Sequence, residues 1–271
     1  MKKTENLSKI SCYLLDLDGT VNLGERLLNG ALDFFGEIQK QNKRFLFATN
    51  NSTMTKAQYV HKFTALGVTL TEDNVLTSGD ALIHLLKRQK PGAHVYSIGT
   101  PTFEGEMEKA GFTVHRKPDA DVDLVTIAFD DTLTYEKLAA ASRLVCAGIP
   151  YVSTSSDLRC PVPGGAFIPD CGLITEVIEK TTGVKPLYHA GKPGKTMLEM
   201  AAALTGLPFD RMAVVGDRLY TDIRMAYDHG ATGILVLTGE ATREDAAASP
   251  TPPHFIYADI GELARAVHEA G

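Results

Sequence analysis

The chain has 271 residues with a formal net charge of −6 at pH 7, and 44% of its residues are hydrophobic. This composition is typical of a globular protein with one large or two medium-sized apolar cores, and it argues against intrinsic disorder. The negative net charge and the lack of a dense Lys/Arg block argue against nucleic acid or an anionic membrane as the main partner.

The sequence contains no run of about 18 apolar residues that could span a membrane. Residues 1–6 lead into no apolar stretch of signal-peptide length. We therefore expect a cytoplasmic protein. The four cysteines lack CxxC spacing, so reduced thiols are expected rather than disulfides or zinc ligands; they are Cys12, Cys146, Cys160 and Cys171.

Short apolar runs alternate with amphipathic stretches along the chain. Strands are predicted over residues 12–17, 44–48, 95–98, 124–128, 212–215 and 234–237, and helices over residues 30–40, 56–66, 135–146, 196–204 and 223–229. This alternation predicts an α/β fold in which helices cover both faces of a parallel sheet. Ligands of such folds bind at the carboxyl ends of the strands, so polar residues at those ends are the candidates for function.

Two carboxylates follow the apolar run of residues 12–15, where a buried strand is expected to end, in the segment DLDGT of residues 16–20. Carboxylates at the end of a buried strand are costly unless a partner neutralises them, and Mg²⁺ is a suitable partner because it prefers oxygen ligands. Asp16 could attack phosphorus, and Asp18 could protonate the leaving oxygen and later activate water. The alternative is a solvated Asp-Gly turn.

The second predicted strand is followed by the polar segment TNNST of residues 49–53. By composition alone the segment is typical of a helix cap. Its position at a strand end favours a further role, in which the Thr49 hydroxyl and the backbone N–H groups of Asn50 and Asn51 hold phosphoryl oxygens at the start of a helix.

A lysine and a second acid pair follow later apolar runs. Lys192, in the segment GKP, could neutralise a phosphate and the nucleophile, although most lysines are simply solvated. Asp217 and Asp222 lie in the segment GDRLYTD of residues 216–222. Asp217 suits metal binding, whereas Asp222 could either cap the next helix or join the metal shell and orient Lys192 or a metal-bound water.

These four segments, in this order and each after a strand, resemble the motifs of the haloacid dehalogenase-like (HAD) hydrolase superfamily. The residue sequences TNN, GKP and GDRLYTDI resemble the motifs of subfamily IIA, which contains NagD-type and 4-nitrophenyl phosphatases. The resemblance covers nearly the whole chain. It implies a Rossmann-like core and a Mg²⁺ cofactor. Carried over residue by residue, it implies Asp16 as nucleophile and metal ligand, Asp18 as general acid and base and backbone-carbonyl metal ligand, Asp217 as metal ligand, and Thr49, Asn50 and Lys192 as phosphate binders.

The long interval between Thr49 and Lys192 predicts an inserted domain. We place it at residues 81–185, where two apolar runs suggest a separate α/β sheet, with residues 1–80 and 186–271 forming the catalytic core. The resemblance implies a C2-type cap that excludes bulk water and contacts the substrate. The Pro/Gly-rich segment of residues 155–165 is a candidate specificity loop or an ordinary connection.

The sequence therefore predicts a Mg²⁺-dependent phosphatase that hydrolyses a small phosphorylated metabolite through an aspartyl phosphate. A phosphomutase would share Asp16 and Asp18, but the sugar phosphomutases of this superfamily carry the cap between the first two motifs. Dehalogenase chemistry needs neither Asp18 nor a metal. A non-catalytic phospho-ligand sensor is the alternative outside enzymes, and a homodimer is expected because caps in this family often take part in dimers. The motifs do not identify the substrate.

Overall fold

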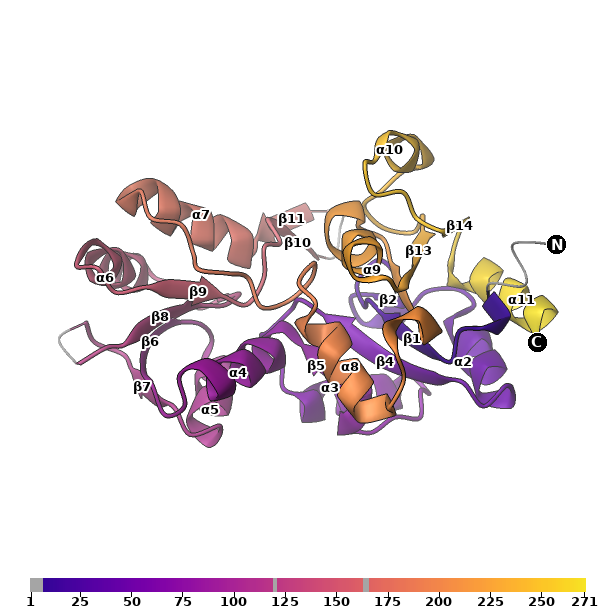
Figure 1. Ribbon diagram of the computed structural model, residues 1–271, viewed down its shortest axis with the longest axis horizontal. Helices are drawn as coiled ribbons and strands as arrows, with labels where there is room; N and C mark the ends of the chain where they lie inside the picture. The colour runs from indigo at the N-terminus through magenta and orange to yellow at the C-terminus, as the bar shows by residue number, and fades with distance from the viewer. Residues whose placement is uncertain (1–6, 119–120, 163–165) are drawn as a thin grey trace. The chain divides into compact units, whose positions relative to one another are not determined.

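The computed structural model describes residues 7–118, 121–162 and 166–271 (Figure 1). Within it the chain forms two compact units. The core unit comprises Met1–Thr49, Lys56–Leu76 and Met197–Gly271, and the inserted unit comprises Asn50–Thr55 and Thr77–Thr196. Each unit has a sheet of its own, so each is described separately.

A six-stranded sheet forms the centre of the core unit, and its strands lie in the order β14-β13-β12-β1-β4-β5. Figure 1 labels β14, β13, β1, β4 and β5 of this sheet. Strand β1 runs parallel to β12 and β4, and β13 runs parallel to β12 and β14. The predicted parallel α/β fold is therefore confirmed. The strands are β1 (Cys12–Leu15), β4 (Arg44–Thr49), β5 (Val75–Thr77), β12 (Met212–Gly216), β13 (Thr232–Val236) and β14 (Phe255–Tyr257).

The order of these strands places a topological switch point between β1 and β12. After β1 the chain adds strands outward through β4 and β5, whereas after β12 it adds them in the opposite direction through β13 and β14. The crevice outside the carboxyl ends at such a point is where open α/β sheets bind ligands. Asp16 leaves β1 there, with its backbone N–H donating to the Val215 carbonyl at 2.9 Å.

Aromatic side chains attach helix α2 to one face of this sheet. Tyr13 and Phe45 are in register on β1 and β4 and so point to the same face. Phe34 of helix α2 meets Tyr13 edge-on, and Phe35 of the same helix contacts Phe45. The helices of the core unit are α2 (Ala31–Lys40), α3 (Lys56–Ala65), α8 (Thr196–Thr205, which begins at the boundary), α9 (Arg224–His229), α10 (Arg243–Ala248) and α11 (Ile260–Ala270).

The inserted unit has a parallel four-stranded sheet in the order β7-β6-β8-β9. Its own apolar core includes residues of helices α6 and α7. The elements are α4 (Ser78–Gln89), β6 (His94–Ile98), α5 (Pro101–Lys109), β7 (Thr113–His115), β8 (Leu124–Ile127), α6 (Tyr135–Cys146), β9 (Tyr151–Ser153) and α7 (Cys171–Thr182). An antiparallel hairpin of β10 (Arg159–Val162) and β11 (Ala166–Pro169) lies between β9 and α7.

The six strands and five helices named from the sequence all form, with ends shifted by a few residues. The strand expected over residues 12–17 already ends at Leu15, and the helix expected at 223–229 follows a π-helical turn, Leu219–Ile223. All four cysteines are free in the structure. No helix among the described residues is both long enough and apolar enough to cross a membrane.

Candidate active site

Three carboxylates from the core unit converge at the switch point. Asp16, Asp217 and Asp222 each offer a carboxylate oxygen, and these oxygens lie within 4.8 Å of one another. Asp16 is partly buried, while Asp217 is 3% exposed and Asp222 is fully buried. The structure thus brings together residues that are about 200 positions apart in the chain, because β1 and β12 are neighbours in the sheet.

The two oxygens of the Asp217 carboxylate differ in their hydrogen bonding. Its Oδ2 accepts a hydrogen bond from the backbone N–H of Glu240 at 2.8 Å. Its Oδ1 is buried and has no hydrogen-bond partner within the described part of the chain. A buried carboxylate oxygen without a donor is unfavourable unless a cation binds it, so this atom indicates a metal site.

Two glycines leave room for the Asp217 carboxylate. A Cβ atom on Gly19 would lie 2.8 Å from Oδ2, and a Cβ atom on Gly239 would lie only 1.9 Å from it. Gly19 also has a φ of +93°, which L side chains rarely adopt. The backbone therefore approaches this carboxylate from two segments and fixes its position.

Asp222 joins the acid cluster and does not occupy a helix N-cap position. It lies inside the π-helical turn, and helix α9 begins with Ile223 at its N-cap and without a side-chain cap bond. A Cβ atom on Gly216 would lie 2.2 Å from Cγ of Asp222, so the glycine allows this side chain to pack against the end of β12. Asp222 therefore lies with Asp16 and Asp217, and its place in a metal shell stays a prediction.

The electrostatics of the cluster favour a bound cation. Burial raises the pKa of the Asp217 carboxyl well above its usual range, and the charges of Asp16 and Asp222 raise it further, against the opposing effects of Arg218 and the Glu240 N–H. Mg²⁺ suits a set of carboxylate oxygens of this kind. The residues present therefore fit the divalent cation expected from the sequence.

Asp18 is held beside the cluster by Asn22. The Asn22 Nδ2 group donates to Oδ1 of Asp18 at 2.8 Å and to the carbonyl of Gly24 at 2.9 Å. Burial raises the pKa of the Asp18 carboxyl, and the charge of Asp16 adds to this, while Lys62 and the Asn22 hydrogen bond lower it. A raised pKa suits a carboxyl group that must donate a proton near neutral pH.

The segment after β13 also contributes to the site, although no motif in the sequence indicates it. Thr238 donates its hydroxyl to the carbonyl of Gly19 at 2.6 Å, and Glu240 supplies the N–H group that binds Asp217. Both interactions use backbone atoms, and both join segments far apart in the chain. No residue-type pattern in the sequence marks such contacts.

Of the predicted phosphate binders, Thr49 ends β4 in the core unit, whereas Asn50 and Lys192 belong to the inserted unit. All three are buried, with exposures of 4%, 4% and 2%. Within the inserted unit, Oδ1 of Asn50 accepts a hydrogen bond from the backbone N–H of Lys192 at 2.9 Å. Each group is therefore assembled within its own unit. The three carboxylates lie together in the core unit, and the Asn50–Lys192 pair forms in the inserted unit.

The candidate specificity segment contains ordered contacts at its start. Asp157, in the segment of residues 155–165, is 4% exposed and accepts a hydrogen bond from Nδ2 of Asn50 at 3.1 Å. Residues 159–162 form strand β10. Residues 163–165 lie outside the described residues.

A cavity of about 820 Å³ in the core unit lies away from the acid cluster. Its lining includes Lys43 and Arg44, at the amino end of β4, together with Phe35 and Phe45. The acids lie at the opposite, carboxyl ends of the parallel strands. The cavity and the acid cluster therefore lie at opposite edges of the sheet.

Two family models of haloacid dehalogenase-like hydrolases match separate parts of the chain. A family model described as haloacid dehalogenase-like hydrolase matches residues 13–113, and a second HAD-hydrolase-like model matches residues 189–263. An acid sugar phosphatase of Staphylococcus aureus (strain MRSA252) is 35% identical over 256 residues, which cover 94% of this chain and 97% of that protein.

Solved structures agree with the fold. The 4-nitrophenylphosphatase of Thermotoga maritima superposes with a TM-score of 0.90 at 40% identity, covering 97% of this chain and 99% of that one. The glycerol phosphate phosphatase of Mycobacterium tuberculosis, solved in complex with magnesium, gives a TM-score of 0.87 at 31% identity, covering 98% of this chain and 79% of that one. The chain therefore belongs to the haloacid dehalogenase-like hydrolases, in the group of NagD-type and 4-nitrophenyl phosphatases.

Proposed function

We propose that this chain is a Mg²⁺-dependent phosphatase that hydrolyses a small phosphomonoester through a phosphorylated Asp16. The main observation in support is the cluster of Asp16, Asp217 and Asp222, in which a buried oxygen of Asp217 lacks a hydrogen-bond partner. Phosphoric monoester hydrolysis is also the activity for which the relatives are named.

Asp16, Asp217 and the backbone carbonyl of Asp18 would hold the metal ion, with Asp222 in or next to its shell. When bound, Mg²⁺ neutralises the acids and the phosphoryl oxygens, and so lowers the electrostatic barrier to attack by an anion. The raised pKa of Asp217 supports this role, because the cluster without a cation carries more negative charge than its burial favours.

Asp16 would attack phosphorus in line with the leaving oxygen, which breaks the ester bond and forms an aspartyl phosphate. Asp18 would give its proton to the leaving alcohol and then take a proton from the water that hydrolyses the intermediate. The hydrogen bond from Asn22 would orient Asp18 for both steps.

Thr49, the backbone N–H of Asn50 and Lys192 would bind the phosphoryl oxygens. The side-chain amide of Asn50 donates to Asp157 and to the Lys192 carbonyl, so its backbone N–H is the better candidate for phosphate binding. Such donors, together with the lysine, stabilise charge that develops in the transition state.

Residues 81–185 would act as a C2-type cap that contacts the part of the substrate beyond phosphate. The four-stranded sheet and separate apolar core of the inserted unit support this proposal. The relatives named above act on sugar phosphate, 4-nitrophenyl phosphate or glycerol phosphate, so we propose a small phosphorylated metabolite as the substrate.

We also propose a cytoplasmic location, which the four free thiols support. A homodimer remains a prediction from the family resemblance.

The test is phosphate release from a panel of phosphorylated metabolites, with and without Mg²⁺, by the native protein and by Asp16→Asn. We expect release that requires the metal and is lost in the variant. Normal turnover by Asp16→Asn would refute the assigned nucleophile, and no release from any substrate would favour the phosphomutase or sensor alternatives.

A further inference from the structure

The side chain of Asn50 pairs with the backbone of Lys192 through two hydrogen bonds. Oδ1 accepts from the Lys192 N–H at 2.9 Å, and Nδ2 donates to the Lys192 carbonyl at 3.1 Å. A side-chain amide that bonds to both backbone groups of one residue restrains the position and orientation of that peptide segment. The lysine is only 2% exposed, so its side chain has little room to compensate for a shift of its backbone.

Asp157 fixes the Asn50 amide in this orientation. The amide nitrogen has two protons; one is donated to Lys192 and the other goes to Oδ1 of Asp157 at 3.1 Å. If the amide rotated by half a turn, its oxygen would face the Asp157 carboxylate and its nitrogen would face the Lys192 N–H. The Asp157 oxygen, which accepts this hydrogen bond, therefore selects the orientation that binds Lys192.

Asp157 is itself attached to the start of helix α7. Its carbonyl accepts a hydrogen bond from the Gly172 N–H at 2.7 Å, and its N–H donates to the Ser155 hydroxyl at 3.4 Å. A Cβ atom on Gly172 would lie 2.4 Å from the Ser156 carbonyl oxygen, so the loop rests directly on the helix backbone. The Asp157 carboxylate is thus supported by regular structure.

The segment before Lys192 packs equally closely. The Gly191 N–H donates to the Thr154 carbonyl at 2.7 Å, and a Cβ atom on Gly191 would lie 2.4 Å from Oδ1 of Asn50. The carbonyl of Asn50 accepts a hydrogen bond from the Ser78 hydroxyl at 2.6 Å. The Asn50 amide therefore lies between two fixed segments of the inserted unit.

We infer that Asp157 is a positioning residue for Lys192 and acts through the Asn50 amide. This inference rests on the proposed function, in which Lys192 neutralises the phosphoryl group. Loss of the Asp157 carboxylate leaves a buried N–H donor of Asn50 without its acceptor and allows the amide to rotate. The two hydrogen bonds that restrain the Lys192 backbone are then weakened. The consequence is weaker phosphate binding and slower turnover, not merely lower stability.

Three variants of the full chain test the inference: Asp157→Ala, Asp157→Asn and, as a matched control, Asp130→Ala. Asp130 is also a buried carboxylate of the inserted unit, with the same 4% exposure, but its partners are Lys137 and Thr132. The measurements are kcat, KM, inhibition by inorganic phosphate and the melting temperature, all with Mg²⁺ present.

We expect Asp157→Ala to weaken phosphate inhibition and lower kcat/KM by about tenfold or more, as outer-shell partners do at other catalytic sites. Asp157→Asn keeps an oxygen acceptor and should stay within about threefold of the native protein. Asp130→Ala should lower the melting temperature and leave phosphate inhibition unchanged. If Asp157→Ala does not fold, Asn50→Asp removes the same donors and should show the same loss.

A double-mutant cycle with Lys192→Met tests whether Asp157 acts through the lysine. We expect Asp157→Ala to cause no further loss of inorganic phosphate binding in the Lys192→Met background. An equal loss in both backgrounds, or native behaviour of Asp157→Ala, would overturn the inference while the phosphatase assignment stands. Failure of the native protein to release phosphate would refute the proposed function, and the phosphate-binding comparison would still test the role of Asp157.

Discussion

A Cβ atom on Gly239 would lie 1.9 Å from Oδ2 of Asp217, closer than any non-bonded contact allows. The next residue, Glu240, donates its backbone N–H to the same oxygen. The loop after β13 therefore holds the carboxylate through backbone atoms, and a side chain at position 239 would displace either the loop or the proposed metal ligand.

Gly239→Ala should weaken Mg²⁺ binding by about tenfold or more, which is the usual cost of disturbing a partner of a metal ligand. Isothermal titration calorimetry of the native protein and the variant measures this directly. Gly36→Ala is the matched control, because its Cβ atom meets nothing within 4 Å and an alanine in helix α2 is favourable. Equal affinities for Mg²⁺ in all three proteins would contradict the assigned role of the loop.

Mg²⁺ should stabilise the protein more at high pH than at low pH. The folded, metal-free protein binds a proton at Asp217 more tightly than the unfolded chain does, because the pKa of this carboxyl is raised. That stabilisation is present below the unfolded pKa and is lost as the pH rises through the raised value. Metal binding replaces the proton, so the increase in melting temperature caused by Mg²⁺ should grow between about pH 5 and about pH 8.

Asp217→Asn removes this titration and serves as the control for the pH effect. In the variant the Mg²⁺-induced shift in melting temperature should be small and nearly independent of pH. A pH dependence as steep as that of the native protein would mean that another group takes up the proton.

Asn22→Ala should move the alkaline limb of the kcat/KM profile to higher pH. The Asn22 hydrogen bond favours the ionised form of Asp18, so its loss raises the pKa of this carboxyl further. The alkaline limb reports loss of the acid form, which is needed to protonate a poor leaving group. With 4-nitrophenyl phosphate, whose leaving group needs no proton, the shift should be absent; a downward shift with an alkyl phosphate would contradict the assignment of Asp18.

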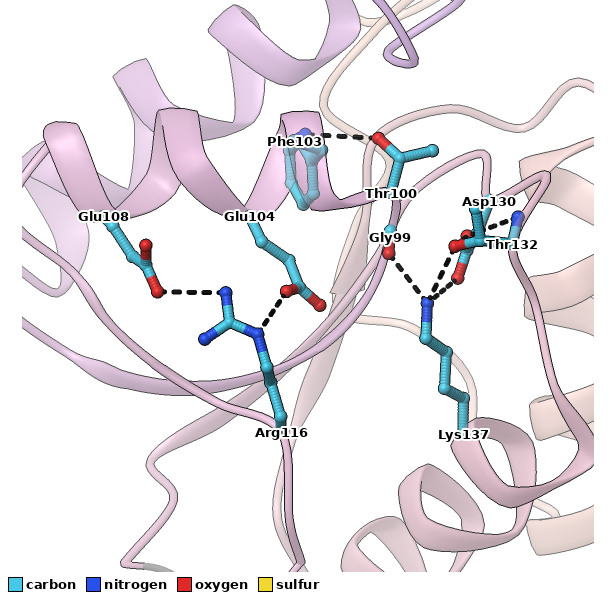
Figure 2. Close-up of polar contacts among 9 residues, drawn as sticks. All are labelled: Gly99, Thr100, Phe103, Glu104, Glu108, Arg116, Asp130, Thr132 and Lys137. Atoms are coloured by element: carbon cyan, nitrogen blue, oxygen red, sulfur yellow. Dashed lines mark hydrogen bonds and ion pairs between the residues drawn. The ribbon is translucent and has the colours of Figure 1, made fainter.

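Lys137→Met should destabilise the inserted unit by about 3 kcal/mol, because it leaves the Asp130 charge buried without its counter-ion. The Lys137 ammonium group donates to Oδ2 of Asp130 at 2.6 Å and to the carbonyl of Gly99 at 3.0 Å. Both contacts are drawn in Figure 2. The double variant Asp130→Asn/Lys137→Met should regain part of the loss, since no net charge remains buried. Urea unfolding measures both effects, and an unchanged midpoint for Lys137→Met would show that the ion pair contributes little.

The strands and the acid pairs could be predicted from the sequence because each is marked by a few consecutive residues. Apolar runs end at Asp16 and Asp217, and the parallel sheet then places neighbouring strand ends side by side. The existence of a separate sheet within the insertion followed from apolar runs in the same way. The close approach of Asp222 could not be derived, since it depends on the π-helical turn and on the missing side chain at Gly216.

The missed residues act through backbone atoms or across long sequence distances. Thr238 contacts Gly19 through its hydroxyl group, and Glu240 contacts Asp217 through its backbone N–H. Hydroxyl and N–H groups occur throughout the chain, so they mark no site. Asp157 lies in a Pro/Gly-rich segment that also suits an ordinary connection, and its hydrogen bond to Asn50 distinguishes it. Residue types alone do not reveal such contacts.

The central claim is that Asp16 carries the phosphoryl group during turnover. The most direct measurement uses Asp18→Asn, in which hydrolysis of the intermediate should be slow, mixed with 4-nitrophenyl phosphate and Mg²⁺, quenched in acid and digested for mass spectrometry. We predict phosphate on Asp16 in this variant and none after the same treatment of Asp16→Asn. Phosphate on another residue, or none on Asp16 while 4-nitrophenol is released in an initial burst, would contradict the proposed mechanism.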